Sequence, residues 1–244
     1  MTPMVTCRFD QDKLDPQMPE PLKNFYSRDL ITMMGRHLKR VHPAFDLDGF
    51  VHDATTGLDA LELKQRSARI GDALNRHLPP QLEQAIDVML ASLHPHDNVE
   101  LSSTGMDADG IRGWAVMPMS DLVGRRCGEA FDAALLAQKE MTKRFSSEFG
   151  IRHLILHDQD RAMTALCAWA RDENYHVRRL ASEGTRPRLP WAMQLPAFMA
   201  DPAPCLPILE TLKDDPVEYV RRSVANHLND IAKDNPDTTA QVCS

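Results

Sequence analysis

The sequence has little of what stabilises a β-sandwich or a small disulfide-bonded domain. Aromatic residues make up only 6% of its 244 residues, and there are only 11 glycines. The five cysteines are widely scattered and form no Cys-x-x-Cys pair, which argues against a zinc site or a disulfide framework. No His-Glu-x-x-His spacing occurs, and His153 with His157 is a weak ligand pair, so we expect no metal.

The sequence also lacks a long apolar run and an excess of basic residues. No stretch of about 18 apolar residues occurs, so we expect no membrane span and a cytoplasmic protein with reduced thiols. The net charge of −7 argues against a protein that coats nucleic acid without preference. Acids and bases nearly balance between Asp132 and Asp234, however, so a local basic face remains possible there.

What the sequence does have is helical periodicity, with frequent Ala, Leu and Met. Residues 1–20 lack this pattern and predict a mobile tail, and residues 21–244 predict one domain. A polar segment at 94–110 predicts a surface loop between the two halves. The predicted helices cover residues 21–40, 58–78, 81–93, 119–127, 130–145, 147–156, 161–171, 176–183, 192–199, 205–213 and 217–233.

Two of the predicted helices look like copies of one another. The stretches DENYHVRRLASEG and DDPVEYVRRSVANHL align with Val177 on Val220, an offset of 43 residues. Helix pairs that repeat every 40 to 47 residues or so are typical of HEAT-type solenoids, which leave a concave polar surface. We therefore predict an all-α fold, a right-handed α-solenoid of HEAT-like helical repeats.

Polar residues on and between these helices are candidates for that concave surface. Arg179 and Glu183 share one side of a helix, and Asp230 belongs to a polar stripe with Arg222. The connecting loop, GTRPRLPW, holds Trp191 between proline and alanine. That ring either caps the core between repeats or offers its face to a cation or a base.

Four stretches of the chain resemble a known family. LDALELKQRSARIGDALNRHLPP, MTKRFSSEFGIRHLI, NYHVRRLASEGTRPRLPWA and VRRSVANHLNDIAKDNPD are similar to the AlkC branch of the AlkC/AlkD-type bacterial DNA alkylation-repair glycosylases. His153 departs from the pattern, because the family more often has proline there. Many members carry an immunoglobulin-like C-terminal domain, which we do not expect here because the sequence ends at Ser244.

The resemblance implies a monomeric, nucleoid-associated enzyme without a metal or an organic cofactor. Such an enzyme acts on double-stranded DNA and hydrolyses the N-glycosidic bond of cationic alkylated bases such as N3-methyladenine. An N-alkylated base already carries positive charge and leaves without a general acid, so carboxylates need only stabilise an oxocarbenium-like sugar. The implied catalytic residues are Glu183, Asp230, Trp191, Arg179 and Glu148. We expect the DNA to contact Arg186, Arg188, Arg222, Lys143 and Arg144.

Structural interpretations stay open beside these roles. Glu148 could pair with Arg152 four positions on. Arg178 and Arg221 recur in both copies, which favours a repeat-stabilising role over phosphate contact. The rival functions are a non-catalytic HEAT-repeat module that binds damaged or branched DNA and a protein-interaction scaffold.

Overall fold

The computed structural model describes residues 21–96 and 106–242, and the predicted tail at 1–20 lies outside them. The described residues form helices joined by short connections, with no strand among them, so the all-α prediction is confirmed. The α-helices are α1 (Arg28–Val41), α2 (Leu47–Thr55), α3 (Leu63–His77), α4 (Leu82–Ala91), α5 (Val116–Arg125), α6 (Phe131–Thr142), α7 (Gly150–His157), α8 (Gln159–Trp169), α9 (Tyr175–Gly184), α10 (Pro196–Ala200), α11 (Leu206–Leu212), α12 (Glu218–Ala232) and α13 (Pro236–Val242). The short 3-10 helices are η1 (Leu22–Phe25), η2 (Leu58–Ala60), η3 (Gly113–Ala115), η4 (Cys127–Glu129) and η5 (Ala203–Cys205).

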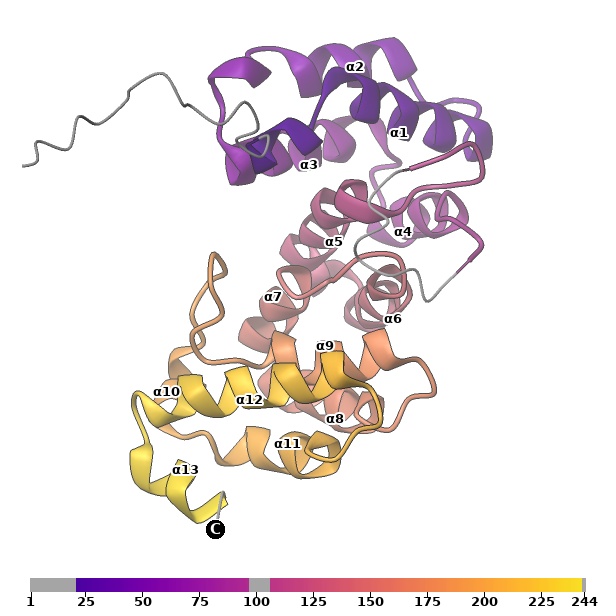
Figure 1. The fold of residues 1–244 in the computed structure, drawn as a ribbon. Coiled ribbons are helices and arrows are strands. Elements are labelled where there is room, and N and C mark those ends of the chain that lie inside the picture. The colour runs from indigo at the N-terminus through magenta and orange to yellow at the C-terminus, as the bar shows by residue number, and fades with distance from the viewer. Residues whose placement is uncertain (1–20, 97–105, 243–244) are drawn as a thin grey trace, which may run out of the picture.

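The helices stack as successive layers from α1–α3 at one end to α11–α13 at the other (Figure 1). Helix α3 packs on α5, α5 on α7, and α9 on α12, so these helices form an inner row. A continuous apolar core runs through the layers, from Tyr26 and Phe50 to Leu180 and Val224. In the described part of the chain, no helix is both long and apolar enough to cross a membrane.

Helix ends follow local capping signals that shift the predicted boundaries. Helix α1 begins at Arg28 and not near Pro21, because the Ser27 side chain accepts the Leu30 N–H at 3.2 Å. Helix α3 begins at Leu63 and not at Leu58, because Glu62 and Gln65 form a capping box. Both predicted helices were therefore too long at their N-terminal ends.

Two helices were missed in the sequence. Helix α2 contains Gly49 and follows Pro43, which obscured its periodicity, yet Asp46 caps it by accepting the Gly49 N–H at 3.0 Å. Helix α13 has a polar sequence with no buried residue. The predicted surface loop is anchored at its two ends, because Leu93 and Ile111 form an isolated parallel bridge. Residues 97–105 of this loop lie outside the described residues.

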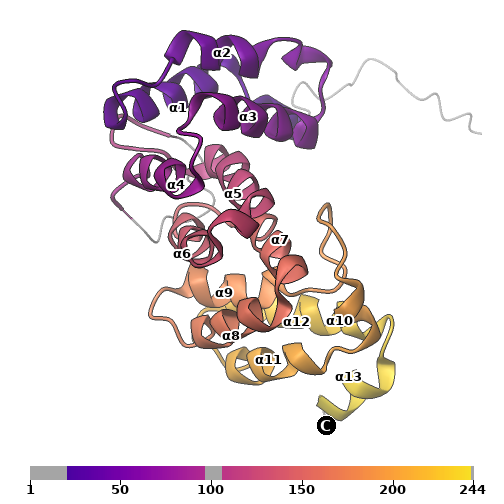
Figure 2. The ribbon, with the colours of Figure 1, turned by 180° about the vertical axis from the view of Figure 1, so that it is seen from behind.

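One loop departs from the regular stacking. The segment between α9 and α10 rises from the C-terminal layers toward α3, as both views show (Figures 1 and 2). It contains Trp191 and reaches the N-terminal layers, because the Lys64 ammonium group donates to the Trp191 carbonyl at 2.6 Å. The loop therefore contacts a helix that lies more than a hundred residues earlier in the chain.

Candidate functional site

A pocket of about 300 Å³ lies on the side of the inner helix row that the α9–α10 loop faces. Residues from α3, η3, α5, α9 and α12 contribute to its wall, together with the segment before α7 and the α9–α10 loop. Its lining is Leu63, Lys64, Trp114, Met117, Phe145, Ser146, Glu148, Phe149, Arg179, Glu183, Arg186, Leu189, Pro190, Trp191 and Tyr219. The pocket is thus mostly apolar, with carboxylates and guanidinium groups gathered in one part of the wall.

Arg179 of α9 is the centre of the charged part. Its guanidinium group forms a short ion pair with Glu148, donates to Ser146 Oγ at 2.7 Å and lies 3.3 Å from Glu183. Burial alone would lower the pKa of Arg179, but the nearby Glu148, Tyr219 and Glu183 raise it above its ordinary value. Arg179 therefore carries a fixed positive charge beside two acids.

Glu148 precedes α7 and is the more accessible of those two acids. One carboxylate oxygen accepts hydrogen bonds from Ser146 and Arg179. The other oxygen has no hydrogen-bond donor among the described residues. Glu148 therefore keeps one carboxylate oxygen available in the pocket wall.

Glu183 is buried at the end of α9 and has both oxygens engaged. One oxygen accepts from Arg186 at 2.8 Å, and the other accepts from Ser223 Oγ of α12 at 2.6 Å. Burial would raise the pKa of Glu183, but Arg179, Ser223 and Arg186 outweigh it and lower that pKa below its usual value. Glu183 is therefore held as a carboxylate at neutral pH.

Arg186 joins Glu183 to Asp230 of α12. Its Nε donates to Asp230 Oδ2 at 2.8 Å, and the other oxygen of Asp230 accepts from Lys233 at 3.0 Å. Arg186 is only 8% exposed, so the expectation that it is exposed on its loop was wrong, and its contact with DNA stays a prediction. Its guanidinium group turns inward because two buried carboxylates compensate its charge. We call Glu148, Arg179, Glu183, Arg186 and Asp230 the carboxylate–arginine network.

The structure thus brings all five predicted catalytic residues to one region of the molecule, but only four of them line the pocket. Glu148, Arg179, Glu183 and Trp191 line the pocket. Asp230 is 2% exposed and lies behind Arg186, outside the pocket lining. Asp230 therefore contacts the pocket only through the network.

Trp191 stands at the mouth of the pocket with a strained backbone. Its φ angle is 65°, in the left-handed region that is costly for a bulky side chain. The ring is 59% exposed, so the interpretation that it caps the core between repeats was wrong. An aromatic face held open to solvent at the edge of an acid-bearing pocket suits contact with a cation or a base.

Arg152 holds the base of the Trp191 loop. It is fully buried on α7 and donates to three backbone carbonyls, those of Met193 at 2.6 Å, Gly184 at 3.0 Å and Arg186 at 2.8 Å. Burial lowers its pKa to about 10. The alternative of a Glu148–Arg152 ion pair was wrong, because Arg152 serves the loop and Glu148 pairs with Arg179.

The other predicted DNA-binding residues surround the site at greater exposure and are paired with acids. Arg188 makes a two-pronged contact with Asp234, with both distances at 2.7 Å. Arg222 on α12 pairs with Glu218, and Lys143 pairs with Glu140. Contact of these three residues with DNA stays a prediction.

Arg144 differs from those three, because it holds the chain together. Its Nε donates to the His94 carbonyl at 2.9 Å, and its Nη1 lies near Glu140. Its carbonyl also accepts the Gly113 N–H at 3.2 Å. The Arg144 side chain is mostly buried and joins two segments. Its contact with DNA also stays a prediction.

The recurring arginines of the two sequence copies have the structural role that we favoured. Arg178 binds both carboxylate oxygens of Asp215, at 2.6 and 3.0 Å. Arg221 donates to the Asp215 carbonyl at 2.6 Å. Arg178 therefore pairs with an acid of the neighbouring repeat, as we favoured, whereas Arg221 donates to the backbone of the turn before its own helix.

Several pocket residues were not identified in the sequence. Tyr219 packs under Arg179, whose guanidinium carbon lies 4.9 Å from the ring centroid, and burial raises the pKa of Tyr219 to about 12. Trp114 and Lys64 come from the N-terminal half. Only Tyr219 had a usable signal, since it lies directly before the repeated Val-Arg-Arg.

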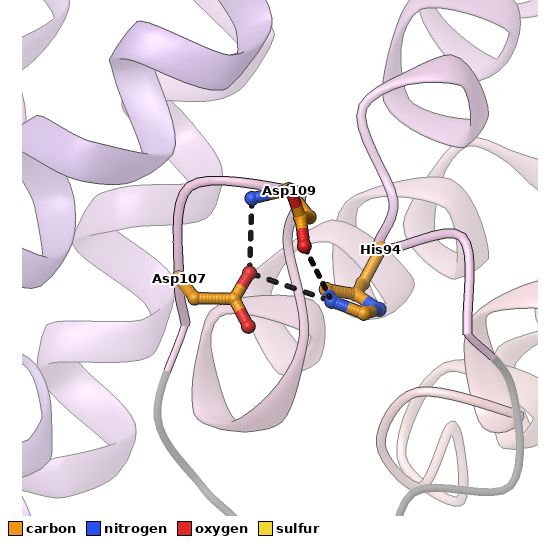
Figure 3. A group of neighbouring side chains, drawn as sticks. All are labelled: His94, Asp107 and Asp109. Carbon is orange, nitrogen blue, oxygen red and sulfur yellow. Dashed lines mark hydrogen bonds and ion pairs between the residues drawn. The ribbon is translucent and has the colours of Figure 1, made fainter.

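A second polar cluster lies away from the pocket. In the described part of the chain, His94, Asp107 and Asp109 have the donor set of a cation site (Figure 3). However, His94 Nδ1 accepts the His96 N–H at 3.0 Å, so the ring proton of a neutral His94 lies on Nε2. That Nε2 faces Asp107 at 3.4 Å, and Asp107 also binds Arg112 at 2.6 Å. A neutral His94 thus presents an N–H to the two aspartates, and not the lone pair that a metal ion needs, while Asp107 is paired with Arg112.

The comparisons with known proteins concern nearly the whole chain. No protein-family model matches it. The uncharacterized protein YhaZ of Bacillus subtilis is 36% identical over 224 residues, which cover 91% of this chain and 58% of YhaZ. The structure of Pseudomonas fluorescens alkylpurine DNA glycosylase AlkC, bound to DNA containing an abasic site analog, superposes with a TM-score of 0.80 at 36% identity. That match covers 93% of this chain and 59% of AlkC, so the chain spans less than two thirds of either relative.

Proposed function

Because this chain is a homologue of the AlkC branch of DNA alkylation-repair glycosylases, we propose that it is itself a DNA glycosylase that releases cationic N-alkylated bases, such as N3-methyladenine, from duplex DNA. The structural relative is described as an alkylpurine DNA glycosylase, and it was solved on DNA that contains an abasic site analog. An abasic site is what remains when a glycosylase has removed a base. The homology extends over the helical-repeat domain that holds the carboxylate–arginine network.

The observation that carries the proposal is the meeting of two carboxylates and an open aromatic ring in one pocket. Glu148 and Glu183 share Arg179, and Trp191 stands at the mouth. Hydrolysis of a cationic nucleoside needs negative charge beside the sugar, because the base leaves without protonation and the sugar becomes oxocarbenium-like. Preorganised charges of this kind are worth about 10²–10³ in rate per group.

The contacts suggest different roles for the two acids of the pocket. Glu148 has a carboxylate oxygen without a protein donor, so it can orient the attacking water and take up its proton. Glu183 has both oxygens occupied, so it acts as a fixed charge near the sugar. Arg179 holds Glu148 in place, and Arg179 and Arg186 together keep Glu183 ionised.

Asp230 has a supporting role in this mechanism. It lies outside the pocket lining and compensates Arg186, which in turn holds Glu183. We therefore treat Asp230 as a positioning residue. Trp191 offers its ring to the cationic sugar or base, an interaction of about 0.5 to 2 kcal/mol.

The partner in this proposal is double-stranded DNA containing alkylated bases, and the protein acts as a monomer without a metal or an organic cofactor. Phosphate contacts would come from the predicted cations Arg188, Arg222 and Lys143, of which Arg222 is exposed and the other two are partly buried. We also expect a cytoplasmic, nucleoid-associated protein.

The test is direct. The protein is incubated with methylated genomic DNA, the released bases are identified by mass spectrometry, and unmethylated DNA and the Glu148→Gln/Glu183→Gln double variant serve as controls. We expect methylated bases, N3-methyladenine among them, only from methylated DNA and only with the wild-type protein. Tight binding of the DNA without release of any base would overturn the proposal in favour of a non-catalytic DNA-binding module.

A further inference from the structure

Lys64 differs from the other cations that line the pocket because no acid neutralises it. It is exposed in the first turn of α3 and lines the pocket. Arg179 and Arg186 in the same pocket are each paired with carboxylates. Among the described residues, no carboxylate lies within ion-pair distance of Lys64, and the adjacent Glu62 is taken by Lys23 at 2.8 Å.

Within the described part of the chain, the Lys64 ammonium group donates to the carbonyl of Trp191, at 2.6 Å. This contact bridges α3 and the raised α9–α10 loop (Figures 1 and 2). A carbonyl satisfies one of the three donors of an ammonium group and leaves its charge uncompensated. The protein therefore holds a full positive charge beside Trp191, at the edge of the pocket.

We propose that Lys64 is a phosphate-binding residue of the DNA interface, which exchanges its contact with the Trp191 carbonyl for a phosphate of the strand that carries the lesion. The inference rests on the proposed function. A hydrogen bond from an ammonium group to a phosphate is charge-assisted and stronger than one to a neutral carbonyl, so the exchange is favourable when DNA is present. The same position brings the phosphate next to Trp191, so the contact sets the register of the sugar against Glu148 and Glu183.

The cations that we predicted from sequence are less available than Lys64 for binding a phosphate. Arg188, Arg222 and Lys143 would each have to leave an acid before they bound a phosphate. Lys64 gives up only a neutral partner. Its contribution to DNA binding should therefore exceed theirs.

The experiment measures binding of the full chain to a fluorescent duplex with an abasic-site analogue, by anisotropy, over a series of salt concentrations. One phosphate contact contributes about 0.9 to the slope of log K against log [salt]. We expect Lys64→Met to reduce that slope by about 0.9 and to weaken binding severalfold at low salt. Lys64→Arg, which keeps the charge, should retain the wild-type slope.

A matched control comes from Lys213 on the surface beyond α11, which pairs with Glu210 and lies outside the pocket lining. Lys213→Met removes the same net charge and should leave the slope unchanged. A wild-type slope in Lys64→Met, or an equal loss in Lys213→Met, would overturn the assignment.

The proposed function and the role of Lys64 can be contradicted separately. Duplex binding with the expected Lys64 dependence but without base release from methylated DNA would remove the catalytic proposal and leave the phosphate contact standing. Base release from methylated DNA together with a wild-type slope in Lys64→Met would support the catalytic proposal and remove the phosphate contact. A wild-type protein that bound no duplex would overturn both.

Discussion

The Arg186 guanidinium group lies between the buried acid Asp230 and the pocket, with 2.8 Å from Arg186 Nε to Asp230 Oδ2. This relationship separates Asp230 from the pocket and connects it to Glu183, which accepts from the same arginine. Because Arg186 and both acids are buried, their charges are only weakly screened by water. Removal of one partner should therefore affect both folding and catalysis.

The first prediction concerns Asp230→Asn. It leaves the charge of Arg186 half-compensated, so we expect the free energy of unfolding to fall by about 3 kcal/mol. Base release should fall as well, because Arg186 no longer holds Glu183 in place. Urea unfolding and single-turnover base release measure the two effects on the same samples.

Asp234→Asn provides the control for that variant, because Asp234 pairs with the more exposed Arg188. It should lower the free energy of unfolding much less than Asp230→Asn does, because exposed ion pairs contribute little to stability. Normal stability of Asp230→Asn with base release reduced about 100-fold would place Asp230 at the reacting sugar and contradict its positioning role.

The second prediction concerns Glu148→Gln. The amide keeps the shape of the side chain but removes the carboxylate oxygen that is free to face the substrate, so base release should fall by about 10² or more. Duplex affinity should stay close to that of the wild-type protein. Single-turnover release from methylated DNA, with anisotropy for binding, checks both parts.

Glu218→Gln is the matched control, since it removes an exposed acid that pairs only with Arg222 in the described structure. Its base release should equal that of the wild-type protein. If Glu148→Gln also released bases at the wild-type rate, the catalytic carboxylate would have to be Glu183.

Much of the fold was predictable because an apolar stripe repeats at helical spacing, as in α12, which was predicted within a residue at each end. Helix α2 was not predictable, because its signal is an Asp46 cap and not a long apolar stripe.

The pocket residues were predictable where they lie in one motif, as Arg179, Glu183 and Trp191 do. Lys64 and Trp114 enter the pocket from helices far away in sequence, and no local pattern indicates such contacts.

The orientation of Arg186 shows the same limit. Its proline-flanked loop indicated an exposed arginine, but Arg152 binds the Arg186 carbonyl at 2.8 Å and anchors the loop at that point. The side chain then reaches Glu183 and Asp230. Burial of Arg186 therefore depends on a tertiary contact with α7, which is absent from the loop sequence itself.

The third prediction uses the backbone of Trp191. Glycine adopts a φ of 65° without strain, so Trp191→Gly relieves the backbone in the folded state while it increases the freedom of the unfolded chain. These effects nearly cancel, and because the ring is largely exposed, little packing is lost. We expect a change in unfolding free energy within about 1 kcal/mol.

Base release by Trp191→Gly should nevertheless fall by about 2-fold to 30-fold, the equivalent of a lost cation–π contact of about 0.5 to 2 kcal/mol. Trp191→Phe keeps an aromatic face and should lose less. Thermal unfolding and base release distinguish this from a structural role, in which stability would fall and activity would follow it.

The last prediction concerns acid stability and the fully buried His227 of α12. Its Nδ1–H donates to the Ser182 carbonyl at 2.9 Å, and Nε2 has no partner among the described residues. Burial lowers the pKa of His227 from 6.5 to about 4, so the folded protein keeps the ring neutral where the unfolded chain is protonated.

The sign follows from proton counting. Between pH 6.5 and about pH 4 the unfolded state binds more protons at this site, so the His227 contribution is fully present above pH 6.5 and is lost as pH falls through that window. From pH 7 to pH 5 the loss is about 2 kcal/mol. His227→Gln cannot titrate and should lose that much less stability between the two pH values, whatever its stability at pH 7. Urea unfolding at both pH values measures the difference, and equal losses in the two proteins would show that His227 is not the group responsible.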